Sequence, residues 1–254
     1  MNKDSDSKEK GKHKETIVSS LGQFVDFVTN LSSSGKIIFR GQINDKPLIP
    51  VVGRNKEREN FFNNEEKIFE TFKREAIPYI KFSVNNDWQW LAIAQHNGVP
   101  TRLLDWTLNP LVALWFAVKY SDKNPEYRIV WAFYYDEYDD RIDTKKVGTP
   151  FSIEKTFVYF PEHIFPYIQA QSGLFTVHHR LNDTKDFVPL NKIHSSDLLL
   201  RKIKIPNKMV PTIRYQLDRT GINSATLFPG LSGIRDKIIY DYRLCDDEFG
   251  ENNK

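Results

Sequence analysis

Apolar residues recur along this chain with two different periods. Spacing of three and four residues, which puts apolar side chains on one face of a helix, occurs at 21–31 and 61–80. Runs of aromatic and β-branched residues, which favour strands, occur at 36–40, 128–135 and 174–178. Because helices and strands follow one another without strict alternation, the pattern predicts an α+β fold with a small mixed sheet flanked by helices.

Capping residues mark the starts of further helices. Asn109-Pro110 is a capping residue followed by proline at the first helical position, so a helix is expected at 111–119. That segment is apolar nearly all round, which predicts deep burial. Asp87 is the expected cap of a helix at 88–96. The other expected elements are an extended stretch at 101–104, a half-buried strand at 198–205, a helix at 206–220 with Pro211 in its first turn, a turn at 227–230 and a last helix at 231–242.

Polar stretches organise the chain into one domain with two tails. Residues 1–19 carry lysines and acids in nearly equal number and few apolar residues, so we expect a disordered tail there. No internal repeat and no linker rich in Pro, Gly or Ser divides 20–243, which we expect to be a single domain. The segment 244–254 is expected to fray, and 51–60 and 136–149 are expected to be polar loops.

The overall composition excludes several classes of protein. The chain has 36 Lys and Arg against 33 Asp and Glu, a formal net charge of +3, which is too small for a protein that wraps a nucleic-acid duplex. The single cysteine, Cys245, excludes a disulfide scaffold and favours a reducing compartment. No run of 18 apolar residues and no apolar secretion signal occurs, so we expect a cytoplasmic protein without a membrane partner.

The common catalytic signatures are absent from the sequence. It has no Gly-rich phosphate loop, no helix with paired metal-binding histidines and no serine-nucleophile elbow. His178 and His179 are adjacent, so on a strand they would point to opposite faces and would chelate poorly. We therefore expect no metal site.

Polar residues that directly adjoin apolar elements are the candidates for a site instead. Arg40 follows an apolar strand and precedes Gly41, so its guanidinium can face a phosphate or carboxylate, with a strand-end ion pair as the alternative. Gln171 precedes Gly173 and a strand, where its side chain can face a cleft. The segment 221–229 is expected to be a packing turn.

A third polar segment, 95–107, lies between two apolar helices. Buried polar groups must be paired, so this segment either forms an internal network or lines a pocket. Arg102 and Asp105 could pair with each other or bind a ligand. Trp106 could stack on a planar ring or fill the core.

An ordered series of short motifs spans about 35–240. The motifs are Phe39-Arg40-Gly41, Gln95-His96 with Gly98, Pro100-Thr101-Arg102-Leu103-Leu104-Asp105-Trp106-Thr107, Asn109-Pro110 with Ala113-Leu114 and Phe116-Ala117, Gln171-Ser172-Gly173-Leu174-Phe175, Ile205-Pro206, Gly221-Ile222 and Leu227-Phe228-Pro229. Taken together in this order, they resemble the FRG domain family.

A second, more distant resemblance is to ADP-ribosyltransferases of the Arg-Ser-Glu type. Phe39-Arg40-Gly41 is similar to the Arg-Gly that ends the first core strand of that family. The segment 104–117 is similar to the family's Ser-Thr-Ser strand and following helix, with Asp105-Trp106-Thr107 in place of Ser-Thr-Ser. The third element of the family is a catalytic Glu, and the residue that stands nearest by order is Gln171. This resemblance implies an ADP-ribosyltransferase-like fold.

The same resemblance implies NAD as the ligand and gives binding roles to three residues. Arg40 would hold the dinucleotide phosphates, and Thr107 would hydrogen-bond the nicotinamide ribose. Trp106 or a nearby aromatic residue would stack on the nicotinamide. Arg102 is the fourth residue that we expect to bind the cofactor.

Catalytic roles fall on three further residues. Gln171 could position a ribose hydroxyl but cannot act as a general base, because an amide does not titrate. The reaction would then depend on stabilising an oxocarbenium-like state, or on His96 or Asp105 as the base.

Three functions are compatible with these residues. The leading hypothesis is a nucleotide-binding enzyme that uses NAD, as an ADP-ribosyltransferase or NAD glycohydrolase. It would act on a macromolecule, either protein or nucleic acid, as a bacterial toxin or phage-defence effector. The alternative is a non-catalytic module that recognises a nucleotide or nucleic acid through Arg40, His96 and Arg102. The third is a protein-interaction domain whose polar cluster only stabilises the fold.

Overall fold

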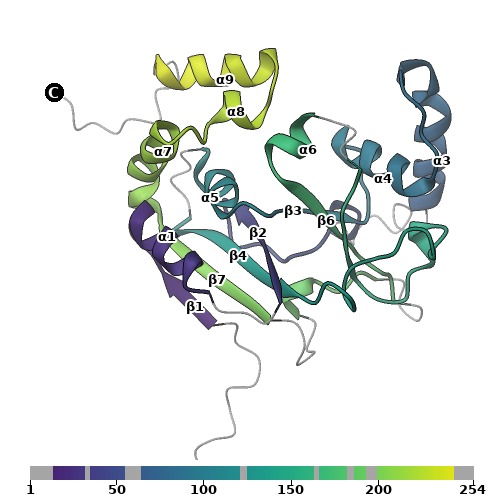
Figure 1. Cartoon of the computed structure of the whole chain (residues 1–254), viewed down its shortest axis with the longest axis horizontal. Helices are drawn as coiled ribbons and strands as arrows, with labels where there is room; N and C mark the ends of the chain where they lie inside the picture. Colours follow the sequence, from purple (N-terminus) through teal and green to yellow (C-terminus); the bar gives the residue numbers. More distant parts are fainter. Residues whose placement is uncertain are drawn as a thin grey trace, which may run out of the picture.

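Seven strands form one mixed sheet, in the order β1-β7-β4-β2-β3-β6-β5 across the sheet (Figure 1). β1 runs parallel to β7, and the other neighbouring strands are antiparallel. The strands are β1 (Lys14–Ile17), β2 (Lys36–Gln42), β3 (Leu103–Thr107), β4 (Tyr127–Tyr135), β5 (Phe157–Tyr159), β6 (Gly173–Val177) and β7 (Leu199–Pro206). The computed structural model describes residues 14–31, 35–54, 64–120, 125–162, 166–181, 186–192 and 199–242.

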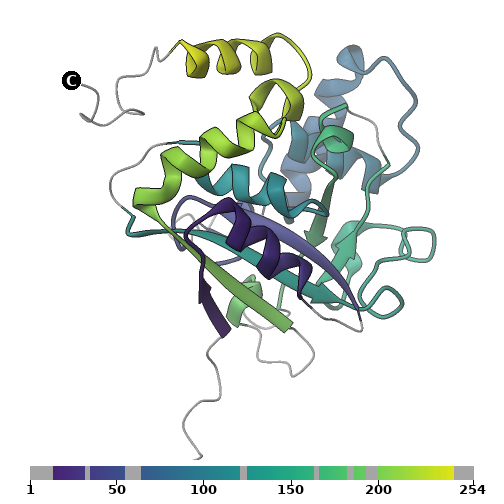
Figure 2. The ribbon, with the colours of Figure 1, turned by 60° about the vertical axis from the view of Figure 1, so that its left-hand side comes forward.

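Eight α-helices accompany this sheet in the described residues, and together they form a single α+β domain, as the sequence predicts. The helices are α1 (Leu21–Thr29), α3 (Glu65–Ala76), α4 (Asp87–His96), α5 (Pro110–Val118), α6 (Pro166–Ala170), α7 (Val210–Arg219), α8 (Ser224–Leu227) and α9 (Leu231–Asp241). Figures 1 and 2 show α1, α5 and α7 over the β1-β7-β4-β2 half of the sheet, and α3 and α4 beside the other half.

Three apolar clusters fix these layers. α1, α5 and α7 pack on one face of the sheet through residues such as Phe24, Ala113 and Ile213. The opposite face carries a second cluster, which includes Trp106 and Trp131. A third cluster joins α3 and α4 to β3, β5 and β6. Burial of apolar side chains on both faces of the central strands provides the main stabilisation of such a fold.

Local signals placed most of the central elements correctly. Ser20 caps α1 by accepting a hydrogen bond from Gln23 N, and Asn109 caps α5 by accepting one from Leu111 N. The cap of α4 differs from the expectation, because Asn86 rather than Asp87 accepts from Gln89 N. Asp87 is the first residue of the helix. Its carboxylate pairs with the Lys73 ammonium at 2.8 Å.

The chain differs from the expected pattern most clearly near its start. Lys14–Ile17 forms strand β1 beside β7, although composition assigned it to the disordered tail. Glu15 has two partners on β7, since its carboxylate pairs with Lys202 at 3.3 Å and also with Lys204. The expected tail residues 1–13 and 244–254 lie outside the described residues, as does Cys245.

The sequence patterns also did not predict three short elements. β5, α6 and α8 have three to five residues each, too few to show a hydrophobic period. The helix expected at 61–80 ends at Ala76 and continues as a short 3-10 turn at Ile77–Tyr79, which contains a proline; residues 61–63 lie outside the described residues. No helix in the described part of the chain is long and apolar enough to cross a membrane.

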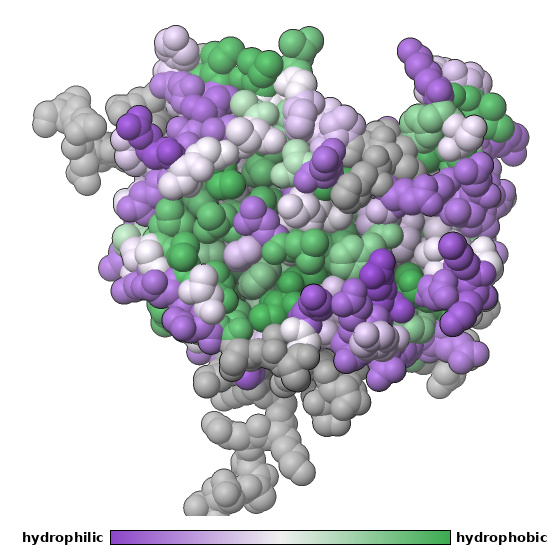
Figure 3. Space-filling model, viewed as in Figure 1, coloured by the Kyte–Doolittle hydropathy of each residue, from purple (hydrophilic) through white to green (hydrophobic). Residues whose placement is uncertain are grey.

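α9 packs on α8 at one end of the domain. Gly233 makes this contact possible, because a Cβ there would collide with the Phe228 carbonyl oxygen. Leu231, Ile234 and Ile238 on α9 remain exposed. Figure 3 shows apolar surface at the top of the molecule, where α9 lies in Figure 1. Phe228 itself is held beneath α9 and reaches the site described next.

Candidate functional site

A pocket of about 510 Å³, here called the cationic pocket, opens where β2 and β3 separate. Within the described strands, β2 pairs with β3 only through Phe39 and Thr107, so the two strands diverge beyond this pair. Residues from β2, β3, α5, the loops after β2 and α8, and the turn between α6 and β6 line the opening. They are Phe39, Arg40, Gly41, Gln42, Ile43, Asn44, Lys46, Arg54, Asp105, Trp106, Thr107, Ala113, Phe116, Lys119, Gln171 and Phe228.

Arg40 spans the gap between the diverging strands. Its Nη1 donates to the Asp105 main-chain oxygen at 2.6 Å and lies 3.6 Å from the Asp105 carboxylate. Its Nε is buried without a hydrogen-bond partner, and its side chain is only 16% exposed. The guanidinium therefore keeps donor capacity beyond what the protein itself uses.

Gly41 shapes the wall of the pocket next to Arg40. A Cβ at this position would collide with the carbonyl oxygen of Ala113 and the main chain at Ala117. The missing side chain allows α5 to lie directly against β2, which brings Phe116 and Lys119 to the pocket.

The charges around the pocket are unbalanced. The described lining includes four cations, Arg40, Lys46, Arg54 and Lys119, but only one carboxylate, that of Asp105. Burial lowers the pKa of Arg40, the Asp105 carboxylate acts in the opposite direction, and neighbouring Arg54 lowers it further. Burial also lowers the pKa of Lys119. A bound anion would favour the charged forms of both groups, so the pocket is suited to an anionic ligand.

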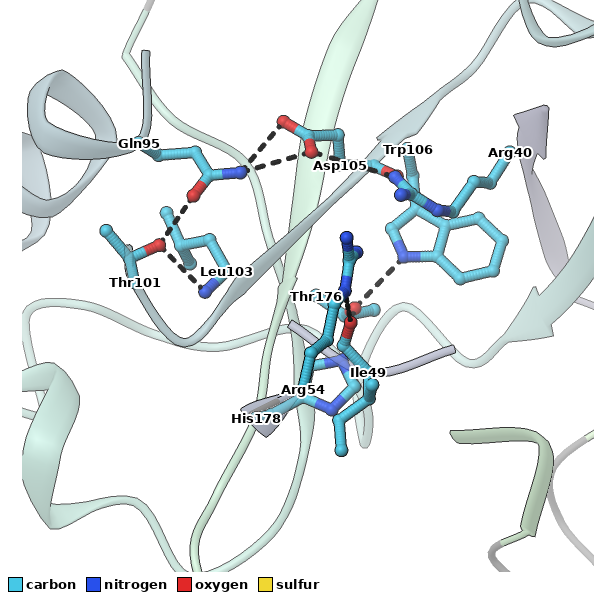
Figure 4. A network of polar contacts seen from close by, with 10 residues as sticks. All are labelled: Arg40, Ile49, Arg54, Gln95, Thr101, Leu103, Asp105, Trp106, Thr176 and His178. Carbon is cyan, nitrogen blue, oxygen red and sulfur yellow. Dashed lines mark hydrogen bonds and ion pairs between the residues drawn. The ribbon is translucent and has the colours of Figure 1, made fainter. Parts of the chain in front are cut away.

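A chain of hydrogen bonds orients the one carboxylate (Figure 4). The Thr101 hydroxyl accepts from Leu103 N at 3.1 Å and donates to Gln95 Oε1 at 2.6 Å. This fixes the Gln95 amide so that its Nε2 faces Asp105 and donates to both carboxylate oxygens at 3.1 Å. Gln95 and Arg40 thus hold Asp105 from two sides.

Thr107 and Gln171 meet at the edge of the pocket next to β6. The Thr107 hydroxyl donates to the Gln171 main-chain oxygen at 2.6 Å and accepts from Asn109 N at 3.0 Å. The Gln171 amide Nε2 donates to the Leu227 oxygen at 3.0 Å, which ties the start of β6 to the end of α8. The side chains of both residues therefore contribute to the assembly of the pocket wall.

His96 lies in a neighbouring pocket of about 240 Å³, here called the aromatic pocket. Its ring stacks on Tyr167, with the ring centres 5.1 Å apart. Burial lowers the pKa of His96, which favours the neutral ring near pH 7. The aromatic pocket shares part of its lining with the cationic pocket, namely Asp105, Trp106, Gln171 and Phe228.

Two of the proposed ligand-binding residues are used differently from the expectation. Arg102 lines neither pocket, because it is buried and forms a two-pronged ion pair with Glu65 at 2.6 and 2.8 Å. The alternative pairing of Arg102 with Asp105 is therefore wrong. Trp106 lines both pockets, but it is 3% exposed and its Nε1 donates to Thr176 Oγ1. Its ring packs on Phe133, so it fills the core and offers little surface for stacking.

The structure adds lining residues that the sequence analysis did not assign to a site. Arg54 follows a 3-10 turn in a segment expected to be a plain polar loop, and its Nε donates to the Ile49 oxygen at 3.1 Å. Lys119 ends an apolar helix, and Phe228 belongs to an expected turn. No local period marks these positions, because only the fold brings them to β2 and β3.

Comparison with known proteins identifies one family. Residues 35–126 match the FRG domain, so an FRG domain is present over these residues. The match includes the whole described lining of the cationic pocket except Gln171 and Phe228. No curated protein and no solved structure matches the chain.

Proposed function

We propose that this FRG-domain protein binds a nucleotide in the cationic pocket, with NAD as the ligand, and transfers its ADP-ribosyl group to a macromolecule or to water. The observation that carries the proposal is the placement of Arg40, Arg54 and Lys119 around one hollow that is also lined by aromatic rings. A flat base with an anionic pyrophosphate has the chemistry that such a lining recognises.

The size and charge of the pocket support this ligand class. A volume of about 510 Å³ falls within the range of small-molecule sites. Arginine forks bind phosphate oxygens in pairs, and Arg40 retains an unpartnered Nε near the pocket. Phe116 and Phe228 supply apolar surface for a base or ribose.

The arrangement of the strands is consistent with the resemblance to ADP-ribosyltransferases. β2, β3 and β6 are neighbours in the sheet, and they bring Arg40, Thr107 and Gln171 to the same opening. The pairing of Thr107 with Gly173 places Gln171 close to the end of β3.

In the proposed reaction, NAD supplies an ADP-ribosyl group when nicotinamide leaves C1′ with the electron pair of the glycosidic bond. Arg40 and Arg54 would hold the pyrophosphate, and Asp105 would face the positive charge that develops on the ribose. The nucleophile, a macromolecular group or water, forms the new bond to C1′ and releases its proton to Asp105 or to solvent. We further propose that the acceptor is a bacterial or phage macromolecule, as befits a toxin or defence effector.

One observation favours a second candidate function, recognition without turnover. Gln171 occupies the place of the catalytic Glu, cannot titrate, and has its amide nitrogen bound to the Leu227 oxygen. A pocket that only recognises a nucleotide would need no base at this position. Such a protein would bind NAD or another nucleotide through the same cations and release no nicotinamide.

The deciding experiment measures NAD binding by calorimetry together with nicotinamide release. We expect Arg40→Ala and Arg54→Ala each to weaken binding by about tenfold or more, because each removes charge-assisted hydrogen bonds. Arg40→Lys, which keeps the charge but loses the fork, should fall between them and the natural protein. Arg74→Ala is the matched control, since that side chain is 70% exposed beside Glu75.

Folding of each variant is checked by circular dichroism and thermal unfolding. Binding with release of nicotinamide supports the enzyme, and binding without release supports the recognition module. If the folded natural protein binds neither NAD nor simpler nucleotides such as AMP and ADP, the nucleotide proposal is wrong.

A further inference from the structure

The two adjoining pockets carry opposite charge. The cationic pocket has four positive side chains and one carboxylate in its described lining. The aromatic pocket, made of Gln95, His96, Asp105, Trp106, Tyr167, Ile168, Gln171, Gly173, Leu174, Phe175 and Phe228, has no lysine or arginine among its described residues. Asp105 is again its one carboxylate. A ligand that extends from one pocket into the other therefore meets a change of sign.

Aromatic surface surrounds the carboxylate in this second pocket. Tyr167 and His96 stack with their ring planes 25° apart, and Phe175 and Phe228 complete the lining. A volume of about 240 Å³ suits one ring or one short side chain rather than a whole nucleotide. Aromatic faces attract cations, especially planar ones that can stack.

Hydrogen bonding makes Asp105 an acceptor at this position. Because Thr101 donates to Gln95 Oε1, the Gln95 amide must present its N–H groups to the carboxylate, and both carboxylate oxygens accept from it. A carboxylate has about four acceptor sites, so capacity remains for another donor. The Asp105 side chain is 60% exposed, which leaves it accessible to a ligand.

From this geometry we propose that the aromatic pocket binds a planar cation, held between the Tyr167 ring and the Asp105 carboxylate. The inference rests in part on the proposed function, because one source of such a group is the pyridinium ring of oxidised NAD. The other source is the guanidinium of an arginine side chain on an acceptor protein. Both are flat, positively charged and able to stack, and both donate hydrogen bonds, the first from its amide and the second from its guanidinium N–H groups.

The first arm of the test uses small probes that do not need the cationic pocket. 1-Methylnicotinamide is a pyridinium cation, nicotinamide is its neutral relative, and agmatine carries a guanidinium. Binding is followed by the NMR signals of the probe and of the His96 and Tyr167 rings. We expect the cationic probes to bind about three- to tenfold tighter than nicotinamide. A preference for 1-methylnicotinamide assigns the pocket to the ligand, and a preference for agmatine assigns it to an acceptor arginine.

The second arm uses variants. Asp105→Asn should remove the preference for the cationic probes, while Asp139→Asn, an acid-to-amide change on an exposed loop outside both pockets, should not. Tyr167→Leu should weaken binding of the cations several-fold, and Tyr167→Phe should preserve it, because only the ring face is required.

Equal binding of nicotinamide and 1-methylnicotinamide, or no binding of any cationic probe, would overturn the inference. A preference that survives in folded Asp105→Asn would overturn it as well. These outcomes are separate from failure of the proposed function, which is measured by NAD binding in the cationic pocket and by the effect of Arg40→Ala. If oxidised NAD binds more tightly than reduced NAD, and if Asp105→Asn abolishes this difference, the aromatic pocket and the cationic pocket bind parts of the same ligand.

Discussion

Arg40 and Arg102 are equivalent candidates in the sequence, but the fold gives them opposite surroundings. Arg102 is 3% exposed, meets both oxygens of Glu65 at 2.6 and 2.8 Å, and donates to the Pro150 oxygen at 3.1 Å. Its guanidinium also lies over the Phe151 ring. Arg40 has a looser contact of 3.6 Å with Asp105 and a buried Nε that no protein group meets.

The difference between the two arginines separates a structural role from a binding role. Arg102 joins α3 to β3 through a closed ion pair, and its donors face protein on all sides. Arg40 holds the diverging strands at one contact and leaves donor capacity at a pocket that contains three further cations. A fully paired buried arginine is costly to remove, whereas an underpaired one is available to an anion.

Removal of Arg102 is expected to have the largest effect on stability. Arg102→Ala leaves the Glu65 carboxylate, 3% exposed, buried without its partner, so the free energy of unfolding should fall by about 3–5 kcal/mol. Chemical denaturation measures this loss. The double variant Glu65→Leu with Arg102→Met should recover much of it, because a well-packed apolar pair can replace a buried ion pair. Recovery that fails would mean that the hydrogen bond to Pro150 carries the effect.

A smaller loss of stability is expected when the pocket wall beside Arg40 is disturbed. Gly41→Ala places a Cβ against the Ala113 carbonyl, so α5 must shift from β2, at a cost of about 1–3 kcal/mol. Gly148→Ala is the control, since nothing lies within 4 Å of that position, and it should change stability by less than about 0.5 kcal/mol. NAD affinity should fall with Gly41→Ala even though every pocket cation remains. Unchanged affinity would show that the packing of α5 does not shape the site.

Local sequence patterns could predict the elements on which the site is built. The apolar run ending in Arg40-Gly41 gives β2, and Asn109-Pro110 gives the start of α5. Gln171 before Gly173 gives the start of β6. These signals are local, because they depend on propensity and capping within a few residues, and they place Arg40 on β2 and Gln171 just before β6.

Pairing between distant segments could not be predicted in the same way. Arg102 finds Glu65, 37 positions earlier, while Asp105 takes Gln95 and Arg40. Nothing in the spacing distinguishes these partners from an Arg102–Asp105 pair. The contributions of Arg54 and Lys119 also depend on how α5 and the loop after β2 pack. Local patterns in a single sequence do not reveal such long-range pairings.

Removal of Arg40 tests the difference between the two arginines, because it should affect NAD binding more than the stability of the fold. Arg40→Ala loses one hydrogen bond to a main-chain oxygen and a long ion pair to an exposed carboxylate, so the free energy of unfolding should fall by about 1–2 kcal/mol. Denaturation of Arg40→Ala beside Arg102→Ala measures the difference. Equal losses of unfolding free energy would mean that Arg40, like Arg102, stabilises the fold and is not kept for binding a ligand in the cationic pocket.

The last expected effect depends on pH and concerns His178, on which the charges of both arginines act. Burial, then the charges of Arg40, His179 and Arg102, lower its pKa to about 3, and its Nε2 lies 2.9 Å from Thr176 Oγ1. Unfolding restores a pKa near 6.5, so the unfolded chain binds a proton that the folded protein does not between about pH 6.5 and 3. This residue's contribution to stability is complete above pH 6.5. It should fall by at most about 1.4 kcal/mol for each pH unit below that.

Denaturation of the natural protein and of His178→Gln between pH 7.5 and 4.5 tests this contribution, because carboxylates affect both proteins alike. The difference between their free energies of unfolding should shrink toward acid. Arg40→Ala should reduce the pH dependence of the unfolding free energy. Loss of one nearby cation raises the pKa of His178, while burial continues to lower it. Parallel pH profiles for the natural protein and His178→Gln would show that His178 gains its proton in the folded state as easily as in the unfolded one. In that case neither burial nor the charge of Arg40 would lower the pKa of His178 in the folded protein.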